Sequence, residues 1–366
     1  MAILSNRLQR PLDYLIDIVQ SAFLLDRDIS DNIRYHQGLG ARLRELGLPG
    51  WLLHSDLTGA YDRTSIGWLL RVMRFMGFRT DGIVRWCRIM AAGARYRVRL
   101  NGQFTASFPV TSGLPQGSAL SCQLWVIVFE PCIAYLNTLQ HAGRITALTM
   151  PSGRPAPAAM AHADDAKLPV IMPDDDGPVI VEAFKTMQRA GMPPQSIEKT
   201  VFVYLGEEGA PLPSTMDAGA PASPPAAGGG GGTLHHHAAT GYRLRERGAG
   251  PHRLLGVPFG AAPGACSEAA YGSTPGAIVA AAQQWAGVRP TLLGRAHVAM
   301  ASLASKVVFQ LGFTPATDAQ LQAVAAPMRR FVASGSAGRM QEEAPLPWRL
   351  YPGAPTCVLP PGRGGL

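Results

Sequence analysis

Hydrophobic residues recur at the spacing of an α-helix in several parts of the chain. Five of them near the N-terminus share one helical face: Leu8, Leu12, Leu15, Ile16 and Val19. The same spacing predicts helices over residues 62–78 and 178–192, and helical patterning returns across residues 285–332. A longer helix is expected from about Ser118, a good N-terminal cap, to Leu139. Helices therefore account for much of the predicted fold.

Three other stretches have the patterns of β-strands. The apolar run "GWLLHSDL" is typical of a buried strand that ends at Asp56. The segment "ARYRVRLNGQFTASFPV" alternates polar and apolar residues, and the pair Asn101-Gly102 at its centre is typical of a hairpin turn. The segment "AAMAHADDAKLPVIM" predicts two short strands that meet at Asp164 and Asp165. The sequence thus combines helices with antiparallel strands.

Composition adds a large irregular insertion to this pattern. Hydrophobic residues make up 47% of the 366 residues, enough for a sizeable core, while 41 glycines and 31 prolines indicate irregular segments. Residues 206–250 include "APASPPAAGGGGG" and are expected to be a low-complexity, disordered insertion. We expect no role for His235 to His237 inside it, and we expect Asp174 to Asp176 to form a polar turn.

Charge and cysteine usage restrict the partner and the compartment. The net charge of +8 favours a polyanionic partner such as nucleic acid. The five cysteines show no C-x-x-C pairing, which fits a reduced intracellular protein of the nucleus or cytoplasm. Glu130 and Pro131 interrupt the most apolar run well short of about 20 residues, so no membrane span is expected.

Three features of the sequence together indicate phosphate chemistry. A strand ends at Asp56, a distant hairpin carries Asp164 and Asp165, and a glycine-rich turn over residues 113–118 begins a helix between them. Carboxylate oxygens bind hard cations such as Mg²⁺, and two such ions about 3.5–4 Å apart activate an attacking oxygen and neutralise a leaving phosphate. Taken alone, the aspartate pair would be interpreted as an exposed turn. With the other two features, it predicts a two-metal site that binds a nucleoside triphosphate.

Five segments in order resemble motifs A to E of reverse transcriptases, particularly those of non-LTR (LINE-type) retrotransposon proteins. They are "SDLTGAYDR", "SGLPQGSALS", "AHADDAKL", "AGMPPQSIEKT" and "RLLGVPFG". The segment "NRLQRPLDYLIDIVQSAFLLDRDISDNI" is similar to the fingers of that family, and "LLGRAHVAMASLASKVVFQLGFTP" is similar to its thumb. Motif C departs from the family at His162, where tyrosine or phenylalanine is usual.

The resemblance implies roles for individual residues of the catalytic centre. Asp56, Asp164 and Asp165 match the metal-binding aspartates, which would hold two Mg²⁺ ions, with Mn²⁺ as an alternative. Tyr61 matches the aromatic steric gate that excludes a ribose 2′-hydroxyl; the alternative is a core aromatic residue. Lys199 matches the lysine of motif D, which would act as a general acid for the departing pyrophosphate. Its segment departs from the family by two prolines and an extra residue, and a solvated lysine is an equal alternative.

Further residues are assigned to substrate and nucleic acid. Gln116 and Gly117 match the "PQG" turn of motif B, which approaches the templating base and incoming nucleotide. Leu255 and Gly256 fall in the primer-grip hairpin of motif E. The remaining candidates are basic residues that would face the phosphate backbone: Arg95, Arg97, Arg99, Arg295 and Lys306. For the three arginines of the strand, an ordinary solvated face is the alternative. Asp62 is expected to cap the following helix.

The resemblance also implies a domain organisation. The fold would be an α+β right-hand polymerase with partial fingers, an antiparallel-sheet palm and a helical thumb. The expected parts are partial fingers (1–50), palm with fingers elements (51–205), disordered insertion (206–250), primer-grip hairpin (251–262), thumb (263–335) and an irregular tail (336–366). We expect a fragment of a longer retroelement protein.

The function implied is RNA-directed DNA polymerisation: deoxynucleoside triphosphates are added to a DNA primer on an RNA template by two-metal-ion nucleotidyl transfer. Two alternatives remain open from the sequence. One is an inactive retroelement remnant that only binds nucleic acid. The other is an RNA-dependent RNA polymerase, which Tyr61 opposes.

Overall fold

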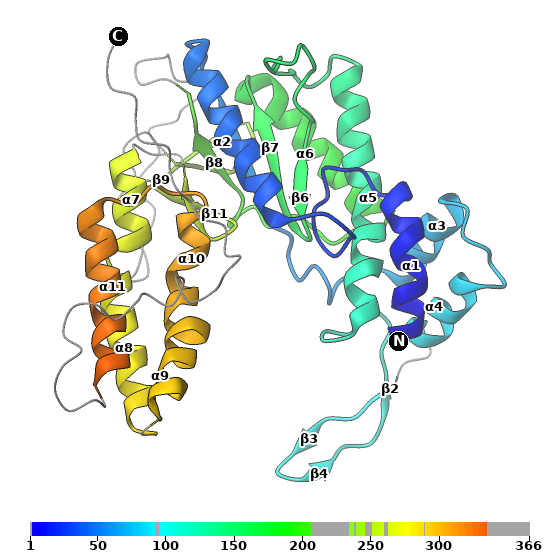
Figure 1. The fold of residues 1–366 in the computed structure, drawn as a ribbon. Coiled ribbons are helices and arrows are strands. Elements are labelled where there is room, and N and C mark those ends of the chain that lie inside the picture. The colour runs from blue at the N-terminus through cyan, green and yellow to red at the C-terminus, as the bar shows by residue number, and fades with distance from the viewer. Residues whose placement is uncertain are drawn as a thin grey trace. The chain divides into compact units, whose positions relative to one another are not determined.

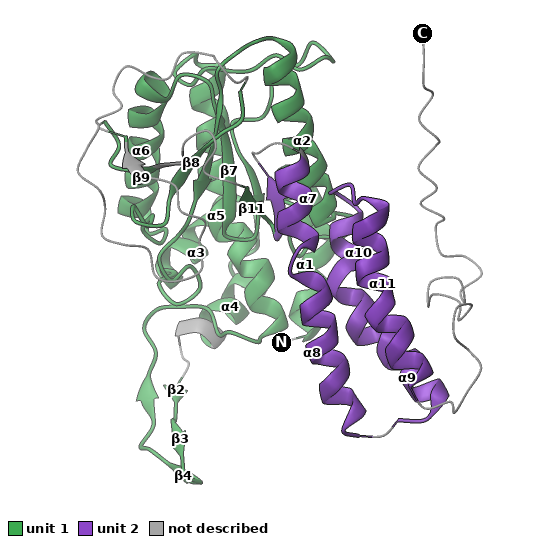
Figure 2. Ribbon diagram, turned by 90° about the vertical axis from the view of Figure 1, so that its left-hand side faces the viewer, with its two compact units in different colours: residues 1–255 green, residues 256–366 purple. Residues whose placement is uncertain are grey.

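The computed structural model describes residues 2–92, 95–206, 234–237, 239–245, 251–259, 263–288 and 290–334. The chain divides into two compact units, residues 1–255 and 256–366, shown in two colours in Figure 2. Each unit contains a hydrophobic core of its own. The segment expected to be partial fingers belongs to the same unit as the expected palm.

The first unit contains six described helices, and the helices expected from hydrophobic spacing are among them. Their bounds are α1 (Ala2–Leu15), α2 (Ile29–Glu45), α3 (Ile66–Phe75), α4 (Ile83–Ala92), α5 (Ala119–His141) and α6 (Pro173–Ala190). Ser118 is the N-cap residue of α5, as predicted. Ser65 caps α3 by accepting a hydrogen bond from the backbone of Trp68, and Gly77, at φ 86°, follows the end of that helix.

A six-stranded sheet forms the centre of the first unit (Figure 1). Its order is β6 (Met160–His162), β7 (Asp165–Val170), β1 (Trp51–Ser55), β8 (Val201–Tyr204), β10 (Arg243–Arg245) and β9 (Leu234–His236). The β8–β10 pair is parallel and the other pairs are antiparallel. Strand β1 lies inside the sheet, which explains why Trp51, Leu52 and Leu53 are all fully buried.

The expectation of a disordered insertion over residues 206–250 is wrong for its described part. Strands β9 and β10 extend the sheet there, and the buried Tyr242 donates a hydrogen bond to Gln195, which in turn donates to Ser55 of β1. Composition predicted disorder, but the edge of β8 offers unpaired backbone groups with which a nearby segment can pair. The low-complexity run itself lies outside the described residues.

The expectations for the histidine run, His235 to His237, and for the aspartate run, Asp174 to Asp176, are also wrong. His237 is fully buried, and its Nε2 lies 2.9 Å from Oδ1 of Asp174. Asp174 to Asp176 form the first turn of α6 and not a polar turn. Asp176 is buried and accepts hydrogen bonds from the backbone of Thr146 and Met172. Three carboxylates at a helix N-terminus are favoured by the helix dipole.

A narrow arm extends from the first unit after α4 (Figures 1 and 2). Its short strands are β2 (Arg95–Tyr96), β3 (Arg99–Leu100), β4 (Gln103–Phe104) and β5 (Phe108–Pro109). Strand β2 pairs with β5 and β3 with β4, and the predicted Asn101-Gly102 turn joins the inner pair with φ values of 49° and 83°. The arm is a hairpin, as the alternation predicted.

Helix α5 is the core helix of the first unit. Thirteen of its 23 residues are buried, and it packs against α1, α3 and α6. By length and composition alone, α5 and the continuous helix over Leu292–Leu311 could each cross a membrane. For α5, burial within the unit accounts for this apolar composition. The absence of a membrane span stays a prediction.

The second unit is largely helical in its described part, in agreement with the patterning over residues 285–332. After β12 (Val257–Phe259) come α7 (Pro263–Tyr271), α8 (Thr274–Ala286), α9 (Leu292–Val298), a π-helical segment (Ala299–Ala304), α10 (Ser305–Leu311) and α11 (Asp318–Ala333). Thr317 and Gln320 form a capping box at the start of α11. Strand β11 (His252–Leu254) belongs to the first unit, so the boundary falls within the expected motif E hairpin.

Candidate active site on the central strands

The pairing of β1 with β7 brings the predicted aspartates to the same end of the sheet. The last pair of this antiparallel ladder is Ser55 with Ala166; Asp56 directly follows β1, and Asp165 is the first residue of β7. Asp164 occupies the two-residue turn between β6 and β7, after Ala163 with its left-handed φ of 60°. Asp56 and the aspartate pair, more than 100 residues apart in sequence, thus lie at one end of the sheet.

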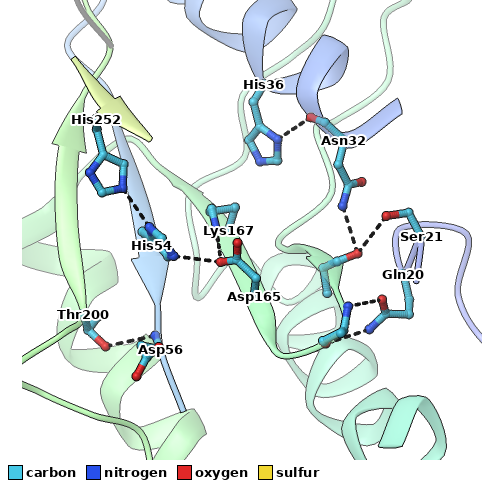
Figure 3. A network of polar contacts seen from close by, with 12 residues as sticks. Gln20, Ser21, Asn32, His36, His54, Asp56, Asp165, Lys167, Thr200 and His252 are labelled. Atoms are coloured by element: carbon cyan, nitrogen blue, oxygen red, sulfur yellow. Dashed lines mark hydrogen bonds and ion pairs between the residues drawn. The ribbon is translucent and has the colours of Figure 1, made fainter. Parts of the chain in front are cut away.

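Asp165 is held by two side chains on the same face of the sheet (Figure 3). The ammonium group of Lys167 forms an ion pair with Asp165 Oδ1, and His54 Nε2 lies 2.7 Å from the same oxygen. His54 and Lys167 are themselves opposite each other in the β1–β7 register. His54 and Lys167 therefore form a cross-strand pair, and both contact Asp165.

His54 is a neutral donor to Asp165. Burial, together with the positive charge of Lys167, lowers its pKa to about 3, and Asp56 opposes the shift. A neutral imidazole has one donor and one acceptor nitrogen, and a carboxylate can only accept. Nε2 therefore donates to Asp165, and Nδ1 accepts from Nε2 of His252, 2.7 Å away on β11. The contact of the two histidines links β11 to β1.

Asp56 is held through its backbone while one side-chain oxygen is left without a hydrogen bond. Its N–H donates to Oγ1 of the buried Thr200 at 3.4 Å, and its carbonyl accepts from Ser196 at 2.9 Å. The buried Oδ2 atom has no hydrogen-bond partner, and Nζ of the exposed Lys199 lies 3.7 Å from it. The predicted motif D lysine therefore lies next to the predicted motif A aspartate.

The donor set is of the kind that a hard divalent ion prefers: carboxylate oxygens, of which Oδ2 of Asp56 has no hydrogen-bond partner and lies 3.7 Å from Nζ of Lys199. Among the described residues, however, no group of three or more histidines, cysteines or carboxylates stands close enough to share an ion. One of these carboxylates, that of Asp165, already forms an ion pair with Lys167. The site therefore has oxygen ligands of the right kind, one of them already engaged.

Buried polar side chains near the N-terminus fix the aspartate turn (Figure 3). The amide of Gln20 donates to the carbonyl of Ala163 and accepts from its N–H, at 3.1 and 2.9 Å. Asn32 donates to the carbonyl of Ala161, and Ser21 lies 2.9 Å from Nδ1 of His162. His162 thus replaces the usual aromatic residue with a hydrogen-bonded ring. No local pattern in the sequence indicates these contacts, which join residues about 130–140 positions apart.

The loops of motifs A and B are joined by backbone hydrogen bonds. The N–H of Gly113 donates to Thr64, and that of Leu114 donates to Tyr61. Gly113 has φ 92°, and a Cβ atom there would lie 2.8 Å from the carbonyl oxygen of Asp62. Only glycine fits this close approach without strain.

Asp62 has a different partner from the one expected. It accepts hydrogen bonds from the side chain of Gln116, while Ser65 caps α3. The expectation that Asp62 caps the helix is therefore wrong. Gln116 and Gly117 are exposed beside this contact, and Gly117 has φ 81°. The motif B turn is thereby held against the end of motif A.

Tyr61 is half-buried and has the packing of a core aromatic residue. Its ring stacks on Trp125 of α5 with centroids 5.5 Å apart and planes 27° apart. Burial raises the pKa of its hydroxyl, with a contribution from Cys122. The alternative that Tyr61 packs against the core is thus confirmed, and its role as a steric gate stays a prediction.

The predicted nucleic-acid residues differ in how their side chains are engaged. Arg95, Arg97 and Arg99 are exposed on the arm, where Arg95 bonds Ser107 and Arg99 lies over the ring of Phe104. Lys306 of α10 is also exposed. Arg295, in contrast, donates to the backbone carbonyls of Val332 and Pro290, both at 2.9 Å. These bonds give Arg295 a structural role within the second unit.

Leu255 and Gly256 connect β11 to β12. Both have left-handed backbone angles, with φ 49° and 88°. Two successive residues with positive φ are typical of a tight hairpin connection. The predicted motif E residues therefore have the backbone of a turn, and contact with a primer stays a prediction.

Two residues of the site were missed from the sequence, although a signal was present. His54 precedes Asp56 by two positions, and Lys167 follows Asp165 by two. Alternate residues of a strand share a face, so both belong to the face of the aspartates. The alternation alone does not show that the two strands are neighbours.

Comparisons with known proteins agree with the motif assignments. A family model described as reverse transcriptase (RNA-dependent DNA polymerase) matches residues 2–165, which include Asp56, Gln116, Asp164 and Asp165. The Transposon TX1 uncharacterized 149 kDa protein of Xenopus laevis is 29% identical over 165 residues. That match covers 45% of this chain and 12% of the relative, so the chain spans only a small part of its length.

Solved telomerase structures are similar over part of their length. Apo telomerase from Candida tropicalis truncated from its C-terminal domain matches with 17% identity and a TM-score of 0.41, covering 67% of this chain and 45% of that one. Telomerase from Candida albicans in complex with a TWJ fragment of telomeric RNA matches with 12% identity and a TM-score of 0.46, covering 91% and 47%. Residues 2–165 are therefore similar to the reverse transcriptase family, and part of the chain is similar to a transposon protein.

Proposed function

We propose that this chain is the polymerase core of an RNA-directed DNA polymerase. It adds deoxynucleoside triphosphates to a DNA primer on an RNA template. The observation that carries the proposal is the β1–β7 register, because Asp56 and Asp165 each lie one position beyond its last pair, Ser55 with Ala166, and Asp164 precedes Asp165. The family match over residues 2–165 supports the same reaction.

The residues of the site suit a nucleotidyl transfer. Asp56, Asp164 and Asp165 would hold two Mg²⁺ ions, which would supply activation of the primer hydroxyl and neutralisation of the triphosphate. Lys199, 3.7 Å from Asp56 and exposed, is in reach of a departing pyrophosphate. Tyr61 and the motif B turn at Gln116 and Gly117 would bound the nucleotide. Catalysis would consist mainly of positioning and charge stabilisation.

Primer extension tests this proposal. The wild-type chain is incubated with poly(rA)/oligo(dT), dTTP and Mg²⁺ or Mn²⁺, beside Asp56→Ala, Asp164→Ala and a control, Asp175→Ala, on the exposed part of α6. We expect incorporation by the wild type and the control, and a loss of at least about 10³-fold in the two site variants.

Three outcomes contradict the proposal. RNA binding without incorporation identifies the chain as a nucleic-acid-binding remnant. Incorporation of ribonucleotides in preference to deoxynucleotides identifies an RNA polymerase. Incorporation that survives both site substitutions shows that the chemistry lies elsewhere.

A further inference from the structure

The chain has only four lysines, and one of them is buried beneath the aspartates. Lys167 is 1% exposed and lies on β7, between His54 of β1 and Met160 of β6. The side chains of Lys185, Lys199 and Lys306 are exposed. An ammonium group is almost never fully buried unless it is paired, because removing its hydration is costly. The position of Lys167 therefore requires a compensating negative charge.

That negative charge comes from the site itself. The ammonium group pairs directly with Asp165 Oδ1. Burial lowers the pKa of Lys167 well below its usual range, and the carboxylates of Asp164 and Asp56 raise it. All three predicted metal ligands thus interact with one ammonium group.

Lys167 pairs with Asp165 from within the sheet, whereas the lysine next to Asp56 is exposed to solvent. Nζ of Lys199 lies 3.7 Å from Oδ2 of Asp56. The buried cation at the aspartates is therefore Lys167.

The aspartate side chains are open to solvent, whereas the lysine is not. Lys167 is enclosed, while the side chain of Asp165 is 29% exposed and that of Asp56 is 36% exposed. An ion entering from solvent would meet a carboxylate whose Oδ1 already accepts from Lys167 and His54. Binding of the ion must weaken this ion pair, because the two cations repel each other across a shared carboxylate.

We propose that Lys167 is a built-in counter-cation of the catalytic aspartates: it holds Asp165 in place without a divalent ion, and competes with the ion for the same carboxylate. Lys167 is thus a positioning residue that sets the metal affinity of the site. The inference rests on the proposed function only in taking the aspartates as metal ligands.

The test compares Lys167→Met, which keeps the length and volume of the side chain, with Lys185→Met, which removes an exposed lysine of α6. The midpoint of thermal unfolding (Tm) is measured in EDTA and across a Mn²⁺ titration. Bound Mn²⁺ is measured separately from the loss of the free-ion signal in electron paramagnetic resonance. Neither readout requires polymerase activity.

In EDTA we expect Lys167→Met to lower Tm by about 10 °C, because the partly buried carboxylate of Asp165 loses its partner, and Lys185→Met to have little effect. In Mn²⁺ we expect Lys167→Met to bind the ion about tenfold more tightly than the wild type and to gain more in Tm. The double variant Lys167→Met/Asp165→Asn removes both charges of the pair. It should recover most of the lost Tm in EDTA, and it provides the test should the single variant fail to fold.

Two results would overturn the proposal that Lys167 is a counter-cation. One is a Tm of Lys167→Met in EDTA equal to that of the wild type, and the other is a double variant that is no more stable than Lys167→Met. Mn²⁺ affinity equal to or weaker than that of the wild type would overturn the competition. If the wild type extends primers and binds Mn²⁺ while Lys167→Met behaves identically, this inference fails and the proposed function stands. If the pairing is confirmed in EDTA but no variant binds Mn²⁺, the metal-dependent function and the competition fail together.

Discussion

Asp56 directly follows β1 and Asp165 begins β7, each one position beyond the pair of Ser55 with Ala166 that ends the β1–β7 ladder. The two carboxylates have unequal surroundings. Asp165 accepts from Lys167 and His54, whereas Oδ2 of Asp56 has no hydrogen-bond partner. Asp165 is therefore held by two side chains of the sheet, whereas the cation next to Asp56 is the exposed Lys199, 3.7 Å from Oδ2.

This asymmetry predicts different costs for removing each charge. In EDTA we expect Asp165→Asn to lower Tm by about 5–10 °C, because a buried ammonium group loses its partner. Asp56→Asn should lower it by less than about 2 °C. Differential scanning fluorimetry of the two variants measures this. Equal losses would show that Asp56 is as deeply engaged as Asp165.

The packing of Tyr61 on Trp125 predicts two separable effects of its substitution. Tyr61→Val should lower Tm by several degrees through loss of stacking, and it should raise incorporation of ribonucleotides relative to deoxynucleotides by at least about tenfold if the ring also borders the sugar. Tyr61→Phe, which keeps the ring, is the control for both measurements. A Tyr61→Val variant that loses stability with unchanged sugar selection would leave Tyr61 as a core residue only.

The two glycines of motif B predict a contrast in stability. Both have positive φ, but a Cβ on Gly113 would meet the Asp62 backbone at 2.8 Å, while nothing lies within 4 Å of one on Gly117. Gly117→Ala should cost about 1–2 kcal/mol for its left-handed backbone. Gly113→Ala should cost at least about 2 kcal/mol more, through the displaced loop. Urea denaturation compares them, and similar costs would contradict the close approach of motifs A and B.

Because Glu130 is buried, we expect the free energy of unfolding to fall as the pH rises. Burial raises its pKa to about 8, against a hydrogen bond from the N–H of Asp17, and Oε2 has no hydrogen-bond partner. Because the folded pKa lies above the unfolded value of 4.5, the folded state holds the proton more tightly. Its contribution is fully present below about pH 4.5 and is lost as the pH rises through about 8.

Glu130→Gln keeps the acceptor for Asp17 and removes the titration. We expect the Tm of the wild type to fall by about 5 °C or more between pH 5 and 8.5, relative to that of Glu130→Gln. Glu182→Gln, at an exposed carboxylate on α6, serves as the control for a lost surface charge. Parallel pH profiles for the wild type and Glu130→Gln would show that Glu130 is ionised throughout.

The arm predicts a salt-dependent contribution to RNA binding. Residues 66–110 contain eight arginines and one aspartate, so they carry +7 of the net charge of +8. Replacing Arg95, Arg97 and Arg99 with alanine should weaken binding of single-stranded RNA. It should also reduce the slope of the logarithm of the binding constant against the logarithm of the salt concentration by up to about 2, because each lost phosphate contact removes about 0.7. Fluorescence anisotropy at several salt concentrations measures the slope. Arg189→Ala, which removes an exposed arginine of α6 paired with Glu182, is the control. An unchanged slope would identify the arm face as ordinary solvated surface.

The sequence alone determined those features that depend on neighbouring residues. The strand before Asp56, the hairpin at Asp164 and Asp165, and the helix after Ser118 were all read from spacing and turn residues, because faces and caps are local properties. Residues 206–250 show where prediction from local patterns fails. Their composition indicated disorder, but β10 gains backbone partners from β8, which no local pattern reveals.

Only the tertiary structure decided what surrounds the aspartates. The pairing of Trp51 with Val170 and of His54 with Lys167 joins segments more than 100 residues apart, and its register determines which side chains share a face. Shifting that register by one residue would turn Lys167 to the opposite face, away from Asp56. The ammonium beneath the carboxylates therefore follows from the packing of the whole sheet, whereas the carboxylates themselves were visible in the sequence.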